Sequence, residues 1–148
     1  MDGEEITGES IACAADDVSA THVDAQMSAR LNLARGLLHM RHLRLELFNR
    51  DYFGEAAFDM LLDLYVCHRE GRTVFQNDAY IASLVPPATA HRWLQTLQRD
   101  GLVVLSGDRR DRRRTIVNLT PLGCTRIEML FDAWLAIRDS VAGGAPWA

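Results

Sequence analysis

The sequence has 148 residues, 16 basic and 20 acidic side chains, and a formal net charge of -4. This length is enough for one domain with a hydrophobic core and too short for most two-domain enzymes. Four prolines, ten glycines and 48% hydrophobic residues argue against a disordered or fibrous protein. No apolar run approaches the ~20 residues that cross a bilayer, and no secretory signal is visible. We therefore expect a cytoplasmic protein without membrane contact.

Charge is distributed unevenly along the chain. Residues 1–24 contain seven acids and no base, and we expect them to form a mobile acidic tail. Residues 25–148 then contain 13 acids and 16 bases, so this part of the chain is mildly basic. Every base is arginine, which genomic base composition explains, and the arginine fork can bind phosphate and base edges in ways that lysine cannot.

Hydrophobic periodicity predicts several helices in the first half. Residues 25–48 repeat apolar side chains at intervals of three, four and seven, which indicates a long helix with two apolar faces. Residues 54–70 are apolar almost all round and should form the most buried helix, which Gly71 ends. A short β segment at 72–75 and a helix at 76–84 follow.

A turn at Val85-Pro86-Pro87 leads into a helix over residues 87–100, which ends at Gly101. Its apolar stripe consists of Ala90, Trp93, Leu94 and Leu97, so Trp93 is expected in the core or against another domain.

After Gly101 the spacing of apolar residues changes from that of a helix to that of an extended strand. Residues 102–105 and 115–119 are two β-type runs around a turn at 106–114, which predicts a hairpin. Thr120 and Pro121 are an N-cap and a first-turn proline for a last, strongly apolar helix that ends at Gly143-Gly144.

This order of elements is typical of a winged helix-turn-helix, a mainly α fold with a small β-hairpin wing (α+β). We divide the chain into an acidic tail (1–24), an N-terminal dimerisation helix (25–52), a winged helix-turn-helix core (53–120) and a C-terminal dimerisation helix with a short tail (121–148).

The basic residues of this unit favour DNA binding. Seven arginines and three aspartates lie between Arg92 and Arg114, and five of these arginines lie within 108–114. A narrow basic hairpin tip can follow a minor groove, where arginine is the favoured insert. The alternative for the charge run is a solvated turn whose arginines pair with Asp108 and Asp111. On the preceding helix, the residues suited to major-groove edges and phosphates are Thr89, His91, Arg92, Gln95 and Arg99.

Three segments resemble the MarR family of transcriptional regulators: Pro87–Val103, Asp108–Arg113 and Val117–Gly123. They show a recognition helix ending in Leu-x-x-x-Gly-Leu, a wing with Asp-x-Arg, and a Val-x-Leu-Thr-x-x-Gly return strand. With a weaker match from Phe58 onward, the resemblance covers a little under half of the chain. The sequence departs from the pattern at Arg109, where the family usually has proline, and at Pro86, since the helix has no polar N-cap.

The resemblance implies a recognition helix in the major groove and a wing that enters the minor groove or grips phosphate. The wing residues concerned are Arg109, Arg110, Asp111, Arg112 and Arg113, with Asp111 orienting Arg113. It also implies a homodimer on a pseudo-palindromic operator, and a repressor that blocks a promoter sterically. The apolar surface of both terminal helices supports the dimer independently, whereas packing of the two helices on each other within a monomer is the alternative.

The sequence gives fewer indications of regulation than of DNA binding. Many MarR-like proteins bind small anionic or phenolic effectors between the dimer layer and the wing domain, and the candidate cleft residues here are His39, Arg41 and His42, with Arg44 nearby. A solvated polar stripe on a long helix is the alternative. His39 and His42 have no third ligand, so we expect no metal site and no cofactor.

Two cysteines bear on oxidant sensing, which we expect to be absent. Cys67 lies in the most apolar helix, where burial raises the thiol pKa, whereas Cys124 lies near a helix N-terminus, which lowers it.

An enzyme is not expected, because the sequence lacks a phosphate-binding glycine loop, a nucleophile elbow and an HExxH motif. Asp59 and Asp63 are one helical turn apart, which a solvated or salt-bridged face explains. The competing hypothesis is a winged-helix module that binds a protein partner through its apolar helices and has no specific affinity for DNA.

Overall fold

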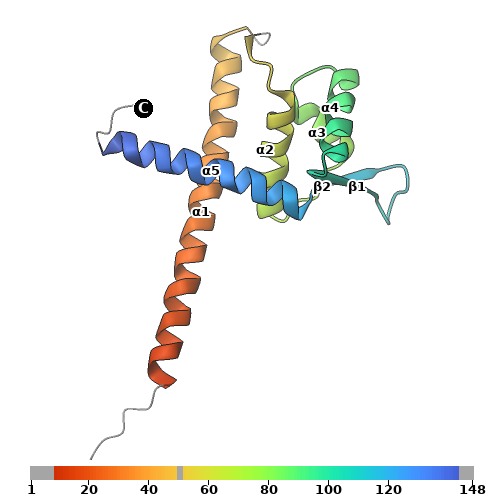
Figure 1. Cartoon of the computed structure of the whole chain (residues 1–148). Coiled ribbons are helices and arrows are strands. Elements are labelled where there is room, and N and C mark those ends of the chain that lie inside the picture. The colour runs from red at the N-terminus through yellow and green to blue at the C-terminus, as the bar shows by residue number, and fades with distance from the viewer. Residues whose placement is uncertain (1–8, 50–51, 144–148) are drawn as a thin grey trace, which may run out of the picture.

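The computed structural model describes residues 9–49 and 52–143, with side chains from Ser19 onward. The elements follow in the order α1 (Glu9–Leu47), α2 (Ala56–Arg69), α3 (Gln76–Ala82), α4 (Pro87–Arg99), β1 (Val103–Gly107), β2 (Thr115–Leu119) and α5 (Pro121–Ala142). The long helix α1 is crossed by α5, while α2, α3 and α4 lie on one side and the β1–β2 hairpin projects from the far end (Figure 1). The predicted winged helix-turn-helix fold is confirmed. None of the described helices combines the length and apolar character that a membrane span requires.

The long first helix departs from the sequence-based expectation. We expected a mobile tail over residues 1–24, but α1 already begins at Glu9, and only the part up to Gly8 lies outside the described residues. Alanine is frequent between residues 9 and 25 and is the strongest helix former. High acidity alone was therefore a poor indicator of missing structure.

The hydrophobic core is centred on α2, which contacts α1, α3, α4, β2 and α5. Its fully buried large side chains come from α2, α4, β2 and α5: Met60, Leu62, Tyr65, Leu94, Val117 and Phe131. The rings of Tyr65 and Phe131 meet edge to face with centroids 5.2 Å apart, which joins α2 to α5. The expectation that α2 is the most buried helix is confirmed, with ends that differ by one or two residues from those predicted.

The hairpin is antiparallel, and Val103 pairs with Leu119 at its base. The β segment expected at 72–75 is reduced to one bridge between Phe75 and Ile116, next to a hydrogen bond from Val117 N–H to Val74 O of 2.9 Å. These contacts attach the wing to the body at the start of α3.

Two glycines are required by this geometry. Gly101 has φ of 73°, in the left-handed region that ends α4 and turns the chain into β1. A Cβ at Gly123 would lie 2.1 Å from the Leu102 carbonyl oxygen, so only glycine lets α5 approach the hairpin. Thr120 caps α5 by accepting the Gly123 N–H at 3.0 Å and also donates to Gly101 O at 2.6 Å. The predicted N-cap is confirmed.

Candidate nucleic-acid interface

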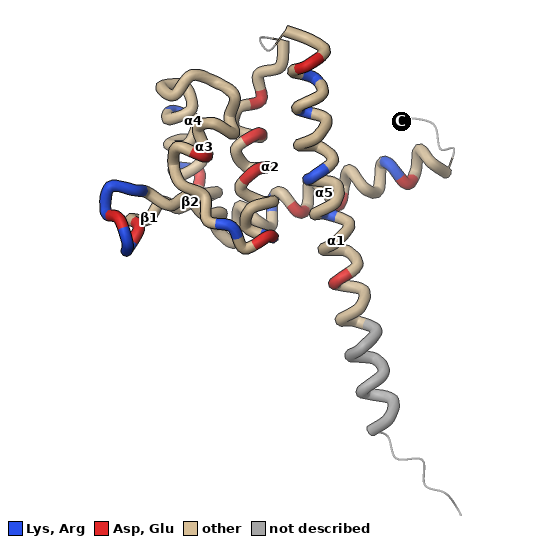
Figure 2. Tube along the Cα trace, turned by 180° about the vertical axis from the view of Figure 1, so that it is seen from behind, with Lys and Arg blue, Asp and Glu red and all other residues tan. Residues whose placement is uncertain are grey.

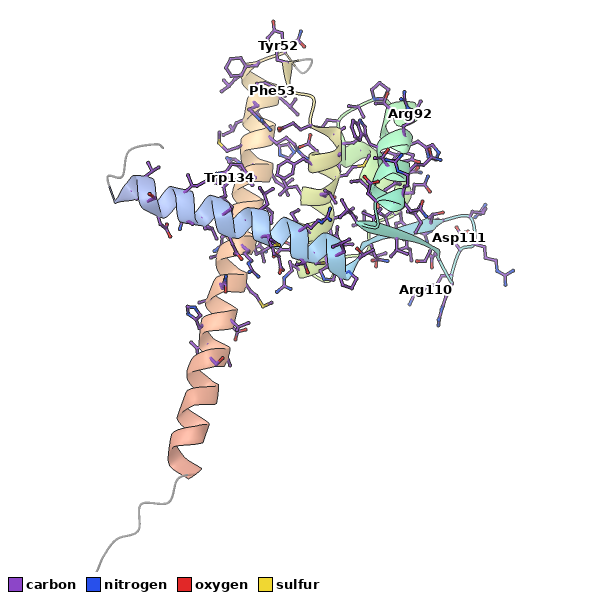
Figure 3. The ribbon with its side chains drawn as sticks, in the orientation of Figure 1. Tyr52, Phe53, Arg92, Arg110, Asp111 and Trp134 are labelled. Atoms are coloured by element: carbon purple, nitrogen blue, oxygen red, sulfur yellow. The ribbon has the colours of Figure 1, made fainter. Side chains whose placement is uncertain are left out.

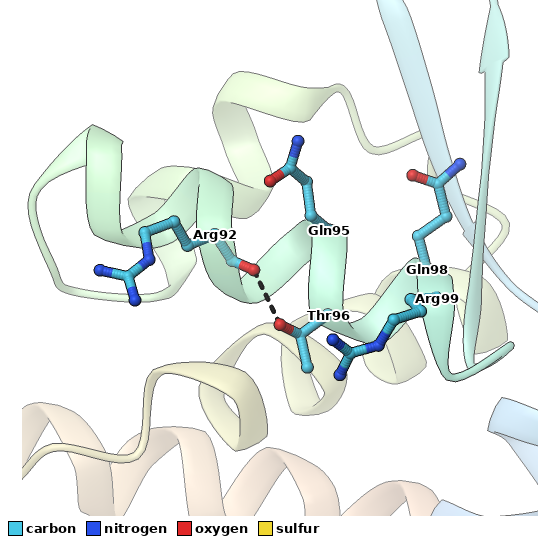
Figure 4. A pocket seen from close by; sticks show the side chains of 5 residues that line it. All are labelled: Arg92, Gln95, Thr96, Gln98 and Arg99. Atoms are coloured by element: carbon cyan, nitrogen blue, oxygen red, sulfur yellow. Dashed lines mark hydrogen bonds between the residues drawn. The ribbon is translucent and has the colours of Figure 1, made fainter.

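Helix α4 presents one buried and one exposed face. Ala90, Leu94 and Leu97 are buried against the core. The five residues that the sequence assigned to DNA contact are all exposed: Thr89, His91, Arg92, Gln95 and Arg99. A shallow hollow on the solvent side of the helix is lined by Arg92, Gln95, Thr96, Gln98 and Arg99 (Figure 4). The hydroxyl of Thr96 donates to the Arg92 carbonyl at 3.0 Å, so its methyl group points away from this bond.

Some of these side chains already have partners. His91 Nδ1 lies 2.6 Å from Tyr80 Oη, and the two rings meet edge to face with centroids 6.1 Å apart. Gln76 donates to the same hydroxyl, so a short polar chain links α3 to α4. Arg99 Nε is 3.1 Å from Asp100 Oδ1, but both groups are exposed, and such pairs are weak. The remaining members of the set, Thr89, Arg92 and Gln95, have no side-chain partner among the described residues.

The tip of the wing is organised by two aspartates. Asp108 Oδ1 accepts the Arg110 N–H at 2.9 Å, and Asp111 Oδ1 accepts the Arg113 N–H at 3.0 Å. Arg113 also approaches Asp111 through Nε at 3.2 Å and Nη2 at 3.4 Å, and these hydrogen bonds lower the pKa of the Asp111 carboxyl. The inferred contact between Asp111 and Arg113 is therefore present, without the proline that the family usually has at position 109.

Of the five arginines of the tip, Arg113 and Arg114 have carboxylate partners and the other three do not. Arg114 turns toward the body, where its guanidinium lies 4.5 Å from the centre of the Phe75 ring and Nε lies 3.6 Å from Asp108 Oδ2. No local pattern indicated this anchor, because Phe75 is far away along the chain. Arg109, Arg110 and Arg112 have exposed side chains, and no carboxylate of the described residues lies within 4 Å of them.

The free cations of the wing lie on the same side of the molecule as α4. The blue tip of the hairpin projects beyond the body (Figure 2), and Arg110 and Asp111 extend outward from it while Arg92 extends from α4 (Figure 3). Helix α4 and strand β1 are in contact, so the hairpin leaves the body next to α4. The expectation that the arginines form a solvated turn paired with aspartates applies to Arg113 and Arg114 but not to the other three.

The candidate effector residues are not brought together. His39 and His42 are exposed on α1, and His42 Nδ1 lies 2.7 Å from the Leu38 carbonyl of its own helix. Arg41 is 7% exposed, and its Nη1 donates to Ala82 O at 3.0 Å and lies 3.7 Å from Asp59 Oδ1. The expectation of an accessible Arg41 is wrong, because a buried cation is held by internal partners. Burial raises the pKa of the Asp59 carboxyl, and of the two expected settings, a solvated or a salt-bridged face, the structure shows the salt-bridged one.

A small hollow of about 10 Å³ lies beside this pair and is lined by Arg41, Arg44, Leu45, Phe53, Glu55, Asp59 and Leu84. The Nε atoms of Arg41 and Arg44 are buried there without a hydrogen-bond partner. Within the described part of the chain, no three histidine, cysteine or acidic side chains form a group that could hold a metal ion.

The thiol pKa values of Cys67 and Cys124, the cysteines whose side chains the structure describes, are shifted in the same direction. Burial raises the pKa of the Cys67 thiol to about 11, helped by the nearby Asp63 carboxylate. Burial also raises the pKa of the Cys124 thiol, so the lowering that we expected from the helix N-terminus is outweighed.

One residue of this region was misassigned from the sequence. Trp93 was expected in the core or against another domain, but 43% of it is exposed on α4. It lies on the border of the apolar stripe, where periodicity alone does not decide between burial and exposure.

The fold and the exposed basic surface define a winged helix-turn-helix with flanking helices. No family model matches the sequence, and no curated protein matches it. Solved structures do match, among them MepR of Staphylococcus aureus, a transcription regulator of the multidrug efflux pump MepA, with a TM-score of 0.53 and 21% identity over 77% of this chain and 82% of MepR.

Two further structures of the same regulator give similar values. MepR bound to ethidium bromide has a TM-score of 0.52 and 20% identity over 78% of this chain and 81% of that one. A single-residue mutant of MepR bound to an oligodeoxyribonucleotide has a TM-score of 0.52 and 19% identity over 86% and 84%. The MarR-like fold that the sequence resemblance implied is thus confirmed at the level of structure.

Proposed function

We propose that this protein is a MarR-type transcriptional regulator that binds double-stranded DNA sequence-specifically and not an enzyme. The observation that carries the proposal is the set of unpaired, exposed arginines Arg109, Arg110 and Arg112 on the hairpin that leaves the body next to α4, whose polar face is also exposed. Unpaired arginines at a narrow tip suit a minor groove or phosphates. Arg92 and Gln95 offer hydrogen-bond donors on the exposed side of a helix that can enter a major groove. MepR, which has the same fold, has been solved with DNA.

We propose further that it acts as a homodimer on a pseudo-palindromic operator and represses by blocking a promoter. Helix α5 supports this, since its exposed apolar residues Leu130, Trp134, Ile137 and Val141 follow one another at intervals of four, three and four. That spacing places them on one face of α5, which is continuous with the buried Ile127 nearer the start of the helix and lies beside the buried Phe131. An apolar face of this extent is typical of a protein-protein interface.

Release by a small effector is the third part of the proposal. The hollow beside Arg41 and Arg44 contains two buried Nε donors without acceptors, and Glu55 and Asp59 also line it, so the proposed anionic or phenolic effector would supply an oxygen acceptor for these donors. Its present size is below that of any such ligand, so binding requires α1 and the segment before α2 to move apart. Ethidium, the compound bound to MepR in the structure above, is a cation, and the two proteins should therefore differ in effector chemistry.

The function is tested by fluorescence anisotropy of the full chain on a duplex selected from random sequences, with a scrambled duplex beside it. We expect nanomolar affinity and a preference of at least ~10³ at physiological salt. Equal, micromolar affinities that salt abolishes for both duplexes would overturn the proposal and leave a protein partner as the better hypothesis.

The role of the wing is tested by the salt dependence of the same binding. Four or five neutralised phosphates per subunit predict a slope of log K against log salt of about -8 for a dimer. Replacing Arg112 and Arg113 by alanine should flatten this slope by about 0.9 for each phosphate that the two side chains neutralise. The control is Arg138→Ala, which removes an exposed arginine of α5 outside its apolar face and should leave the slope unchanged.

A further inference from the structure

Trp93 is the large aromatic residue that α4 leaves exposed. With 43% of its surface accessible, it lines a shallow hollow of about 190 Å³ together with Thr89, Arg92 and Thr96. Arg92 and Thr96 also line the hollow of Figure 4, so the indole borders the same solvent face of the helix that the proposed DNA contact uses.

The two flanks of α4 are not equivalent. On one flank, His91 is held against Tyr80 of α3 by the 2.6 Å contact and by the edge-to-face packing of the rings. On the other flank, the Trp93 indole has no hydrogen-bond partner among the described residues. The open flank therefore offers a broad apolar ring with a free N–H donor, next to the methyl groups of Thr89 and Thr96.

The size of a major groove brings such a flank into contact. The groove is about 12 Å wide, and a helix with its side chains is about 10–12 Å across, so residues beside the leading edge meet the groove walls. Among the groups exposed in the major groove, the 5-methyl group of thymine is the apolar one, and it is recognised by apolar side chains.

We infer that Trp93 determines specificity by packing its indole on the methyl group of a thymine in each half-site, while the adjacent Arg92 binds phosphate or guanine. This inference rests on the proposed function, because it requires that α4 enters a major groove. It predicts that an operator half-site contains a thymine whose methyl group, and not only its hydrogen-bonding edge, is read.

The test uses the full chain and the duplex obtained by selection, in which each thymine is replaced in turn by uracil. Uracil differs only by the missing methyl group, so Watson-Crick pairing and the groove acceptor remain. For the wild type we expect about fourfold weaker binding when a single contacted thymine is replaced, which is the affinity equivalent of one buried methylene-sized group.

Two variants assign that loss to Trp93. In Trp93→Ala the uracil duplex and the thymine duplex should bind equally, and affinity for the selected duplex should fall at least tenfold while affinity for scrambled DNA is unchanged. Trp93→Phe keeps an aromatic ring and should retain part of the thymine preference. Because Trp93 is exposed, both variants should unfold within a few degrees of the wild type, and circular dichroism checks this.

The outcomes distinguish failure of the inference about Trp93 from failure of the proposed function on which it rests. If the wild type does not distinguish selected from scrambled DNA, the proposed function fails and this inference fails with it. If it does distinguish them, but Trp93→Ala shows the same uracil penalty as the wild type, or no thymine shows a penalty, then the role of Trp93 is overturned and the proposed function stands.

Discussion

The unit from α2 to β2 and the helix α5 differ in how far their apolar surface is covered in the folded chain. The first unit encloses its large side chains, among them Tyr65, Leu94 and Val117, at 2% exposure or less. Helix α5 covers Phe131 fully but leaves Trp134 at 40% and Ile137 at 47% exposure. The enclosed part of the chain, whose Tyr65 is covered by Phe131 of α5, thus carries the basic surface, and the flanking helix α5 leaves other apolar side chains exposed. The proposed DNA contact and the proposed self-association therefore use separate sets of residues.

The largest expected effect concerns the core that α5 shares with α2. Phe131→Ala removes a fully buried ring that packs against Tyr65, and it should lower the free energy of unfolding by about 3–5 kcal/mol. Urea denaturation measures this, and the loss should be the same at every protein concentration. The neighbouring Leu130→Ala removes a half-exposed side chain and serves as the control, whose effect should appear only through association. Equal losses for both variants would contradict the separation of the two faces.

A second change tests the exposed apolar face of α5. Trp134→Glu combined with Ile137→Glu places two charges in the exposed apolar stripe of α5, and we expect the dimer to dissociate at least 100-fold more readily, since unpaired charges oppose apolar burial. Sedimentation equilibrium measures the dissociation constant, and circular dichroism checks that the helices persist. Ala136→Glu adds one charge to the same helix away from that stripe and should leave the dimer intact. A wild-type mass equal to one chain at micromolar concentration would refute the premise.

Between the two regions lies a polar connection, and it should have an intermediate effect. Arg30 of α1 binds Asp132 at 2.6 Å and Glu128 at 3.1 Å, and Glu128 accepts the Tyr65 hydroxyl at 3.2 Å. Arg30→Ala leaves two partly buried carboxylates without their cation and should cost about 1–3 kcal/mol of unfolding free energy. Arg35→Ala removes a more exposed pair with Glu70 and should cost less than about 1 kcal/mol.

The same variant should change the response to acid. The Arg30 hydrogen bond lowers the pKa of the Asp132 carboxyl, so the folded state holds fewer protons than the unfolded state in acid. The resulting stabilisation is present above the ordinary aspartate pKa near 3.8 and is lost as pH falls through the lowered value. Urea midpoints from pH 5 downward should therefore fall less steeply for Arg30→Ala than for the wild type. Parallel curves would show that this pair does not contribute.

The sequence predicted the elements because their ends are marked by local chemistry. Gly101, Thr120 and Pro121 have conformational or capping roles that do not depend on distant residues, and the boundaries that they mark are confirmed. The exposed face of α4 was also predictable, since a helix with a clear apolar stripe leaves only one side for polar residues.

Apart from the start of α1, the errors concern contacts between residues far apart in the chain. Arg41 was expected in an open cleft because nothing in the sequence indicates that Asp59 and the Ala82 carbonyl meet it across two helices. Arg114 was counted with the other arginines of the tip, although the Phe75 ring removes it from that group. Trp93 lies at the border of its stripe, where exposure depends on the shape of the neighbouring helices.

The smallest expected effect concerns the thiols of Cys67, which is buried, and Cys124, which is partly buried. Because burial raises the pKa of Cys67 to about 11, only about one thiol in a thousand is ionised at pH 8, and Cys124 is shifted in the same direction. In a Cys13→Ser background, iodoacetamide should therefore modify the folded protein at least tenfold more slowly than the protein in urea, as mass spectrometry can follow. DNA affinity should stay unchanged after mild peroxide. Fast alkylation of Cys124 alone would instead show that the start of α5 opens, and that its contact with α2 is weaker than the enclosed packing of Cys67.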